Sequence, residues 1–267
     1  MSDFSFLDKN KSVDKLKNLP PVYYINLDDQ IDRRQYMETQ FKYWEIKDYT
    51  RISGYDGRNS DLGEIINGKY PDYVNSGEIG CVTSHLRAIK YWYDNSDSKY
   101  ALFLEDDVEL STARFWNFTW SEFFCRVPYN WDCLQLAIIC TGDIHVTLHN
   151  RFVNDFSTAA YVINRQYAEK LIKLHVRGDK YKLDQNVKPR PTADDLIYNA
   201  GVTYSCPLFL YKTEHGSSIH EDHVEIFHKT NYEAINNYWK QQGCQMTVEQ
   251  ITDFNPYLGR VSENNSQ

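Results

Sequence analysis

A single α/β domain with a mainly parallel sheet flanked by helices is the fold that this 267-residue sequence predicts. Short apolar runs rich in β-branched and aromatic residues alternate with helical patterns along the whole chain. No internal repeat interrupts this alternation, which is typical of a parallel sheet covered by helices. We expect the domain to span residues 21–230, after an N-terminal lead-in (1–20) and before a C-terminal helix and disordered tail (231–267).

The first part of the chain is expected to hold two strands and two helices before the most conspicuous motif. In order, these are strand 22–27, a helix carrying Ile31, Met37, Phe41 and Trp44, strand 50–54, a long loop over 55–76, and helix 77–95. The last of these has the strongest helical pattern, because its apolar residues recur at steps of three and four. A loop as long as 55–76 is more often functional than idle in a compact domain.

The rest of the chain continues the alternation. The expected elements are an aromatic helix (115–124), strands 132–139 and 158–163, a helix (166–174), a charged loop (176–193), a short helix (194–200), a strand (203–210) and a helix (232–242). Each strand is read from β-branched and aromatic residues, and each helix from apolar residues at helical spacing.

A strand that ends in three acids is the stretch with the clearest chemistry. The apolar run YALFL is followed at once by Glu105, Asp106 and Asp107. Ligands of open α/β sheets bind just beyond the carboxyl ends of strands. Clustered carboxylates repel one another unless a cation neutralises them, and Mg²⁺ and Mn²⁺ prefer oxygen ligands. An ordinary acidic turn without an ion fits the triplet equally well.

Composition excludes several classes of function. The net charge is −8 and no basic run occurs, which argues against nucleic-acid binding and against a polybasic membrane anchor. No apolar run is long enough to cross a bilayer, and the N-terminus lacks the apolar stretch of a signal peptide, so a cytoplasmic protein is expected, with peripheral membrane contact left open. The six cysteines form no C-x-x-C pair and are expected to be reduced thiols, without a zinc site.

Four segments in order resemble glycosyltransferase family 25: YYINLDDQIDRR, SGEIGCVTSHLRAIK, LFLEDDVEL and STAAYVINRQYAEKLI. This family includes bacterial lipooligosaccharide galactosyltransferases, which act in lipopolysaccharide biosynthesis, and collagen galactosyltransferases. The resemblance covers about residues 21–220. It implies a GT-A fold, in which a Rossmann-like sheet binds a nucleotide sugar beside a divalent metal. The implied reaction moves a sugar, usually galactose from UDP-galactose, with inversion at the anomeric carbon.

Two features of the sequence limit what the resemblance implies. The acidic motif is Glu-Asp-Asp rather than Asp-x-Asp, which is normal for the family but weakens a metal assignment made from the motif alone. The chain also lacks the secretory signal of the collagen-modifying members, so it resembles the bacterial or viral members more.

Sugar transfer requires neutralisation of the departing diphosphate, removal of a proton from the acceptor hydroxyl, and alignment of both. Within the resemblance, Asp107 is the first choice for binding Mn²⁺ (or Mg²⁺), with Glu105 as a second ligand. His215 and His220, in a loop near the C-terminus, are further candidates for the metal, although exposed loop histidines are common.

The nucleotide sugar is expected to contact residues from several segments: Asn26, Asp28, Arg33, Arg34, Glu78, Ser84, His85, Glu105, Asp106, Ser217 and Ser218. A helix N-terminus and an arginine fork after the first strand suit phosphate; surface ion pairs with nearby acids are the alternative, and for Arg34 they fit equally well. Gly77 and Gly80 would let a ligand approach the helix that carries His85, whereas an isolated histidine on a helix is more often structural.

Asp194 and Asp195 are the candidates for the general base, because inverting enzymes of this fold commonly place an acid at such a helix start. Acids near a helix N-terminus also stabilise the helix dipole, which is the alternative. We therefore expect a metal-dependent inverting hexosyltransferase that uses UDP-galactose first and UDP-glucose second. The acceptor would be a saccharide or a protein hydroxyl. A non-catalytic nucleotide-sugar-binding relative and a metal-dependent phosphohydrolase remain the alternatives.

Overall fold

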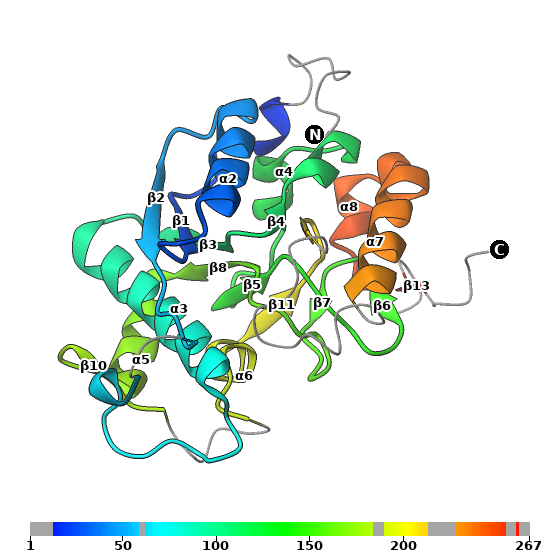
Figure 1. Cartoon of the computed structure of the whole chain (residues 1–267). Coiled ribbons are helices and arrows are strands. Elements are labelled where there is room, and N and C mark those ends of the chain that lie inside the picture. The colour runs from blue at the N-terminus through cyan, green and yellow to red at the C-terminus, as the bar shows by residue number, and fades with distance from the viewer. Residues whose placement is uncertain (1–12, 59–61, 184–189, 213–227, 255–259, 262–267) are drawn as a thin grey trace.

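The computed structural model describes residues 13–58, 62–183, 190–212, 228–254 and 260–261 (Figure 1). Its centre is a seven-stranded sheet with the strand order β2-β1-β3-β8-β5-β11-β7. The strands are β1 (Val22–Asn26), β2 (Tyr49–Ser53), β3 (Tyr100–Glu105), β5 (Cys133–Gln135), β7 (His149–Asn150), β8 (Ala160–Asn164) and β11 (Thr203–Ser205). Five of them run in one direction, and β7 and β8 run against the rest, so the prediction of a mainly parallel α/β sheet is confirmed.

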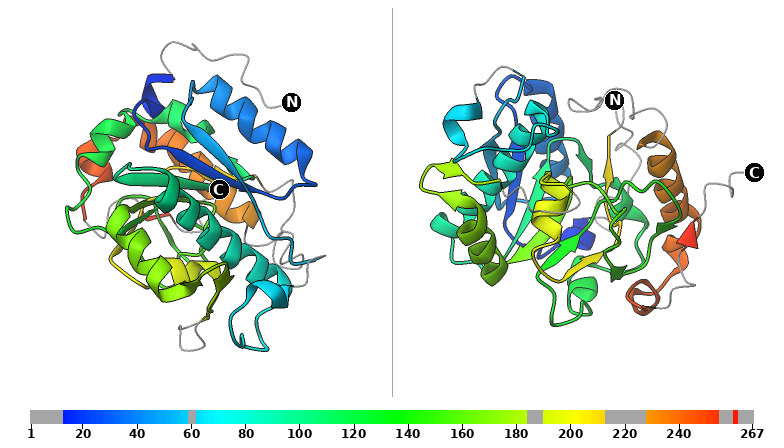
Figure 2. Two further views of the ribbon diagram at one scale, coloured as in Figure 1. Left: turned by 90° about the vertical axis from the view of Figure 1, so that its left-hand side faces the viewer. Right: turned by 90° about the horizontal axis from the view of Figure 1, so that it is seen from below.

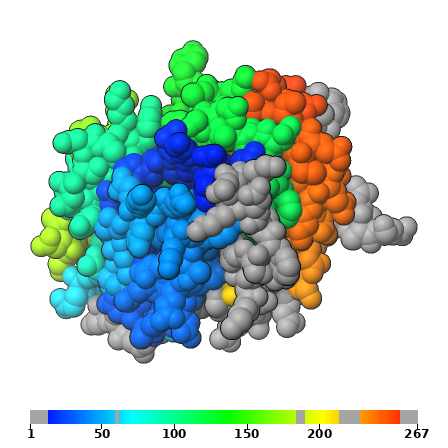
Figure 3. All heavy atoms as spheres, turned by 90° about the horizontal axis from the view of Figure 1, so that it is seen from above, coloured from blue at the N-terminus to red at the C-terminus, as the bar shows by residue number. Residues whose placement is uncertain are grey.

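Helices cover both faces of this sheet (Figures 1 and 2). One face is covered by α2 (Ile31–Tyr43), α4 (Trp120–Phe124) and α7 (Lys229–Gln241), and the other by α3 (Ser76–Asn95), α5 (Arg165–His175) and α6 (Ala193–Tyr198). Figure 3 shows that the N-terminal segments (blue) and α7 (orange) share one face of the molecule. Within the described residues, no helix combines the length and apolarity that a bilayer crossing requires.

Strand β3 shows why the sheet is buried on both faces. Its Leu102 and Leu104 belong to the core on the α2 side, while Ala101 and Phe103 belong to the core on the α3 side. Successive side chains of a strand point to opposite faces, so an apolar run without polar alternation is what a doubly covered sheet requires. Each of these four side chains is fully buried.

Short elements complete the described chain: η2 (Val13–Leu16), η3 (Leu62–Ile65), β4 (Val108–Glu109), η4 (Ser111–Phe115), β6 (Ile144–His145), β9 (Val176–Arg177), β10 (Lys180–Tyr181), β12 (Leu210–Tyr211), η8 (Gly243–Gln245), α8 (Val248–Ile251) and β13 (Arg260–Val261). Three antiparallel pairs lie outside the main sheet, namely β4 with β12, β6 with β13, and β9 with β10.

The single aromatic helix predicted for 115–124 is wrong. The chain forms η4, then an extended link, and then α4, which begins only at Trp120. Thr119 stops the helix from starting earlier, because it forms a capping box with Glu122: each side chain accepts a hydrogen bond from the other residue's backbone N–H. The buried rings of Trp116 and Phe118 stack on each other in the link.

Two other predicted elements are divided by turns. The strand predicted for 203–210 is split into β11 and β12, with Pro207 between them, because proline has no N–H to donate to a ladder. The predicted loop 176–193 contains the β9–β10 hairpin, whose turn includes Gly178 at a φ of +64°. The strand predicted for 132–139 is ordered as a strand only over β5.

Helix α3 lies directly against the loop that follows β2. A Cβ atom at Gly80 would lie 2.7 Å from the carbonyl oxygen of Tyr55 and 2.9 Å from the amide nitrogen of Gly57. The backbone N–H of Tyr55 donates to Ser84 Oγ at 2.7 Å, which fixes the same contact one helical turn later. Gly80 therefore admits the close approach of the protein's own backbone.

We expect Gly80→Ala to destabilise the fold by about 1–3 kcal/mol, because the added methyl group overpacks a backbone contact. This outcome runs against helix propensity, which favours alanine over glycine by about 1 kcal/mol. Gly142→Ala is the matched control, since a Cβ atom at Gly142 meets nothing within 4 Å. Urea unfolding measures both variants. A Gly80→Ala variant as stable as the wild type would show that this close contact is not formed.

Candidate functional site

The candidate site lies where the parallel strands β1 and β3 end side by side. Ile25 is the register partner of Glu105, so Asn26 and the acids after β3 meet at one edge of the sheet. Asn26 is buried, and its Nδ2 donates to Asp106 Oδ2 at 2.7 Å and to the Gln30 carbonyl oxygen at 3.0 Å. Its Oδ1 accepts from Arg51 Nε at 2.9 Å. Asn26 thus links β1, β2, α2 and the acidic turn.

Arg33, from the first turn of α2, joins two of the three acids. One guanidinium nitrogen lies 2.5 Å from Asp106 Oδ1 and 3.1 Å from Asp107 Oδ2. Two buried atoms of this cluster have no hydrogen-bond partner among the described residues: Asp107 Oδ1, an acceptor, and Arg33 Nε, a donor. A buried polar atom without a partner is costly, and an ion, a ligand or an ordered water at this strand end would satisfy these two.

The two aspartates carry raised pKa values. Burial raises the pKa of Asp107 to about 7, and the negative charge of Glu105 adds to this effect while Arg33 opposes it. Burial also raises the pKa of Asp106, against the opposing effects of Arg33 and of the hydrogen bond from Asn26. A cation beside Asp107 would favour its charged form.

Glu105 is held by side chains from two other elements. His85 Nε2 lies 3.1 Å from Glu105 Oε1, and Thr158 Oγ1 donates to the same oxygen at 2.8 Å. Burial raises the pKa of Glu105, but His85, Thr158 and Arg33 outweigh it, so the pKa of this carboxyl is lowered. His85 is buried on α3, and its Nδ1 lies 3.0 Å from the hydroxyl of Tyr161.

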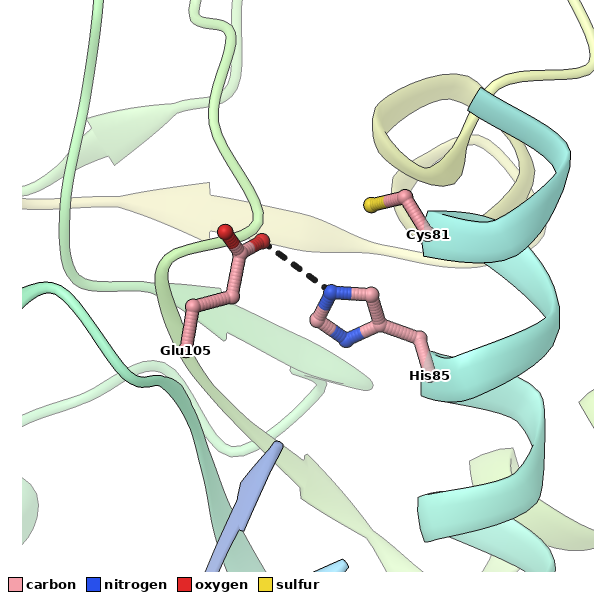
Figure 4. Close-up of side chains that lie close together, drawn as sticks. All are labelled: Cys81, His85 and Glu105. Atoms are coloured by element: carbon pink, nitrogen blue, oxygen red, sulfur yellow. Dashed lines mark hydrogen bonds and ion pairs between the residues drawn. The ribbon is translucent and has the colours of Figure 1, made fainter. Parts of the chain in front are cut away.

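Cys81 extends this group, as Figure 4 shows: the side chains of Cys81 and His85 point from α3 toward Glu105. The sequence places Cys81 and His85 on one edge of this helix, but Cys81 was expected to be only a reduced thiol, and its approach to Glu105 was not predicted. The spacing of four between Cys81 and His85 puts both on one face of a helix, but it does not show that this face meets Glu105. Burial raises the pKa of the Cys81 thiol well above its ordinary value.

Asp194, in the first turn of α6, lies across the site from the acidic turn. The backbone N–H of Ser157 donates to Asp194 Oδ1, and the next residue, Thr158, holds Glu105. Ser157 has a φ of +93°, a backbone conformation that residues other than glycine rarely adopt. Burial raises the pKa of Asp194 to about 6, and Glu105 adds to this while Arg151 opposes it. Two adjacent residues, Ser157 and Thr158, therefore each donate a hydrogen bond to one carboxylate, Asp194 and Glu105 respectively.

Asp195, the neighbouring candidate, is occupied by the protein itself. It is buried and accepts hydrogen bonds from the backbone N–H of Arg190 at 3.0 Å and from Asn199 Nδ2 at 3.2 Å. A guanidinium nitrogen of Arg151 lies 3.9 Å from its Oδ1. These contacts hold the segment before α6 in place.

The other residues predicted to contact the nucleotide sugar lie around this cluster and bond to other parts of the protein. Glu78 completes the capping box of α3 with Asn75 and forms an ion pair with Arg190 at 2.8 Å. Asp28 is mostly exposed, and Arg51 and Ser53 hold it by hydrogen bonds that lower its pKa.

Arg34 Nε lies 3.4 Å from Asn26 Oδ1. Ser84 Oγ donates to the Gly80 carbonyl at 2.6 Å. His215, Ser217, Ser218 and His220 lie outside the described residues.

Acids, an arginine and a buried amide thus gather at the carboxyl ends of adjacent strands of a mainly parallel α/β sheet, which is where such sheets bind ligands. Residues 19–123 match the family model of glycosyltransferase family 25 (LPS biosynthesis protein). This match confirms the resemblance for the first three of the four sequence segments that carry it. It includes the residues from Asn26 to Asp107, whereas Thr158 and Asp194 follow the matched segment.

Similarity to solved structures is low. A197 from STIV aligns with a TM-score of 0.37 at 10% identity, covering 72% of this chain and 84% of that chain. HddC from Yersinia pseudotuberculosis aligns with a TM-score of 0.33 at 11% identity, covering 71% of each chain. No curated protein sequence matches the chain.

Proposed function

We propose that this chain is a metal-dependent, inverting glycosyltransferase of the GT-A type. It transfers a hexose, galactose first and glucose second, from a UDP-sugar to a hydroxyl of a saccharide or a hydroxylated protein. The observation that carries the proposal is the pair of buried atoms without a partner, Asp107 Oδ1 and Arg33 Nε, at the carboxyl edge of β1 and β3. An acceptor for a cation and a donor for a phosphate lie there together.

The residues present fit a hard divalent cation. Asp107 offers a buried carboxylate oxygen, and Glu105 offers a second carboxylate whose pKa is lowered. Asp106 is engaged by Asn26 and Arg33, so we assign Mn²⁺ or Mg²⁺ to Asp107 and Glu105. When bound, the cation supplies positive charge that stabilises the diphosphate of the leaving group.

The reaction is a single displacement in which Asp194 is the base. Its carboxylate accepts the proton of the acceptor hydroxyl while the acceptor oxygen bonds to the anomeric carbon and the bond from that carbon to the UDP oxygen breaks. Arg33 stabilises the charge that develops on the departing phosphate. Asp194 suits this role better than Asp195, because Ser157 occupies only one oxygen of Asp194 while Asp195 is bound on both.

The first test is thermal stabilisation by a panel of nucleotide sugars with and without Mn²⁺. A ligand at one hundred times its Kd adds about 2.7 kcal/mol to the folded state. For a chain of this size we expect this to raise Tm by about 5–10 °C. We expect UDP and one UDP-sugar to act, and only with Mn²⁺. No shift with any nucleotide would contradict the proposal.

Turnover assays then separate this proposal from other activities of the same scaffold. Release of intact UDP together with a glycosylated acceptor supports the transferase. Release of inorganic phosphate would identify a phosphohydrolase. Binding of a UDP-sugar without turnover against any acceptor would identify a non-catalytic binding protein.

A further inference from the structure

Three side chains of different chemistry converge beside the acidic turn. Cys81 and His85 lie one helical turn apart on α3, and Glu105 ends β3 (Figure 4). One ligand atom from each, a sulfur, a ring nitrogen and a carboxylate oxygen, lies within 4.8 Å of the other two. Within the described residues, no other group of three or more such side chains is gathered in this way.

The donor set points to a particular kind of cation. Sulfur and imidazole ligands select borderline-soft ions such as Zn²⁺, whereas Mn²⁺ and Mg²⁺ prefer oxygen alone. Around a tetrahedral Zn²⁺ the ligand atoms stand about 3.3–3.6 Å apart, as follows from metal–ligand distances of about 2.0–2.3 Å. His85 Nε2 and Glu105 Oε1 are already 3.1 Å apart, so the Cys81 sulfur, which lies within 4.8 Å of its partners, is the atom that has to approach.

The surroundings of the three side chains are those of a metal site. Ligating histidines usually bond through their second ring nitrogen to an outer group that orients the ring. The hydroxyl of Tyr161 lies 3.0 Å from His85 Nδ1 and is able to accept or to donate a hydrogen bond. It can thus accept from Nδ1–H and leave the lone pair of Nε2 facing Glu105. Thr158 orients Glu105 in the same way.

We propose that Cys81, His85 and Glu105 form a site for one borderline-soft divalent cation, of which Zn²⁺ is the representative. Three protein ligands leave the fourth position of a tetrahedral ion to water or to a ligand atom. The site uses Glu105, which we also assign to the hard cation of the transferase, so Zn²⁺ and Mn²⁺ compete for this carboxylate. Direct metal binding tests the site whether or not the chain transfers a sugar.

The test is titration of the full-length protein with Co²⁺, a spectroscopic substitute for Zn²⁺. We expect a thiolate-to-cobalt charge-transfer band in the near ultraviolet that saturates at one ion per chain and disappears on addition of Zn²⁺. Cys81→Ser should remove the band. Cys125→Ser and Cys244→Ser, which alter two other accessible thiols, should keep it. Tyr161→Phe should weaken binding by about 10–100-fold.

A measurement on the unaltered protein guards against misfolding of a variant. X-ray absorption of the zinc-loaded wild type should show one sulfur ligand per zinc. The proposal fails if no charge-transfer band forms, if the band persists in Cys81→Ser, or if the zinc has only nitrogen and oxygen ligands.

Discussion

Asp194→Asn is expected to lower kcat by about 10²–10⁴-fold, the usual contribution of a general base. Asparagine has nearly the same shape but cannot take a proton from the acceptor hydroxyl. The wild-type pH profile of kcat/KM should fall below a pKa of about 6, because the base must be ionised and burial raises its pKa to that value. Steady-state kinetics across pH 5–8 measures both effects, and the acidic limb should vanish from the residual activity of the variant.

The same substitution should stabilise the fold. The pKa of Asp194 in the folded state, about 6, is above its ordinary value of 3.8, so the folded chain holds the proton more tightly than the unfolded chain. Ionisation therefore costs stability above pH 6, and this cost is lost as the pH falls toward 4. By linkage it amounts to about 3 kcal/mol at pH 8 and about half of that at pH 5. Urea unfolding at the two pH values measures this gain.

Asp195→Asn provides the matched control on the adjacent residue. Asp195 accepts hydrogen bonds from the backbone of Arg190 and from Asn199, and it lies near Arg151, so loss of its charge should destabilise the fold rather than stabilise it. If Asp194→Asn retains activity within a few-fold of the wild type, while Asp195→Asn loses it without loss of stability, the base is Asp195 and our assignment is wrong.

Asp107→Ala is expected to lower metal-supported turnover by about 10²–10³-fold, because a bound cation contributes several kcal/mol to stabilisation of the leaving group. The variant should also lose the Mn²⁺-dependent rise in Tm with UDP. The fold should persist: the contact of this turn with Lys212 is made by the backbone carbonyl of Asp107 at 2.7 Å, which alanine retains.

Asp94→Ala is the control for the loss of a negative charge alone. It removes an exposed carboxylate that is paired with Lys90 on α3. This control should turn over like the wild type. Unchanged Mn²⁺ dependence in Asp107→Ala would show that the cation is held elsewhere, and the buried Asp107 oxygen would then need another explanation.

Most of the sheet could be predicted from the sequence because its strands are short apolar runs with helices between them. The runs around Tyr24, Phe103 and Val162 each give a strand where predicted. The errors fall where a local hydrogen bond or a proline overrides hydrophobic pattern. The Thr119 cap divides a run of aromatic residues, and Pro207 divides an apolar run that would otherwise read as one strand.

The candidate site could be predicted only where its residues lie close in sequence to a strand end. Asn26 and Asp107 follow from the rule that ligands bind at carboxyl ends of strands. The positions of Cys81 and Thr158 depend on how α3 and β8 pack against β3, which no local pattern specifies. The role of Asp195 could not be separated from that of Asp194, because the distinction rests on contacts with Arg190 and Asn199.

The turn at Ser157 and Thr158 has a mechanical consequence. One residue holds Asp194 and the next holds Glu105, and the peptide unit between them is planar and stiff. A displacement of this turn would act on both carboxylates at once, because each of them accepts a hydrogen bond from it. The proposed proton-accepting group and the proposed cation-binding group are thereby linked through a single turn of the chain.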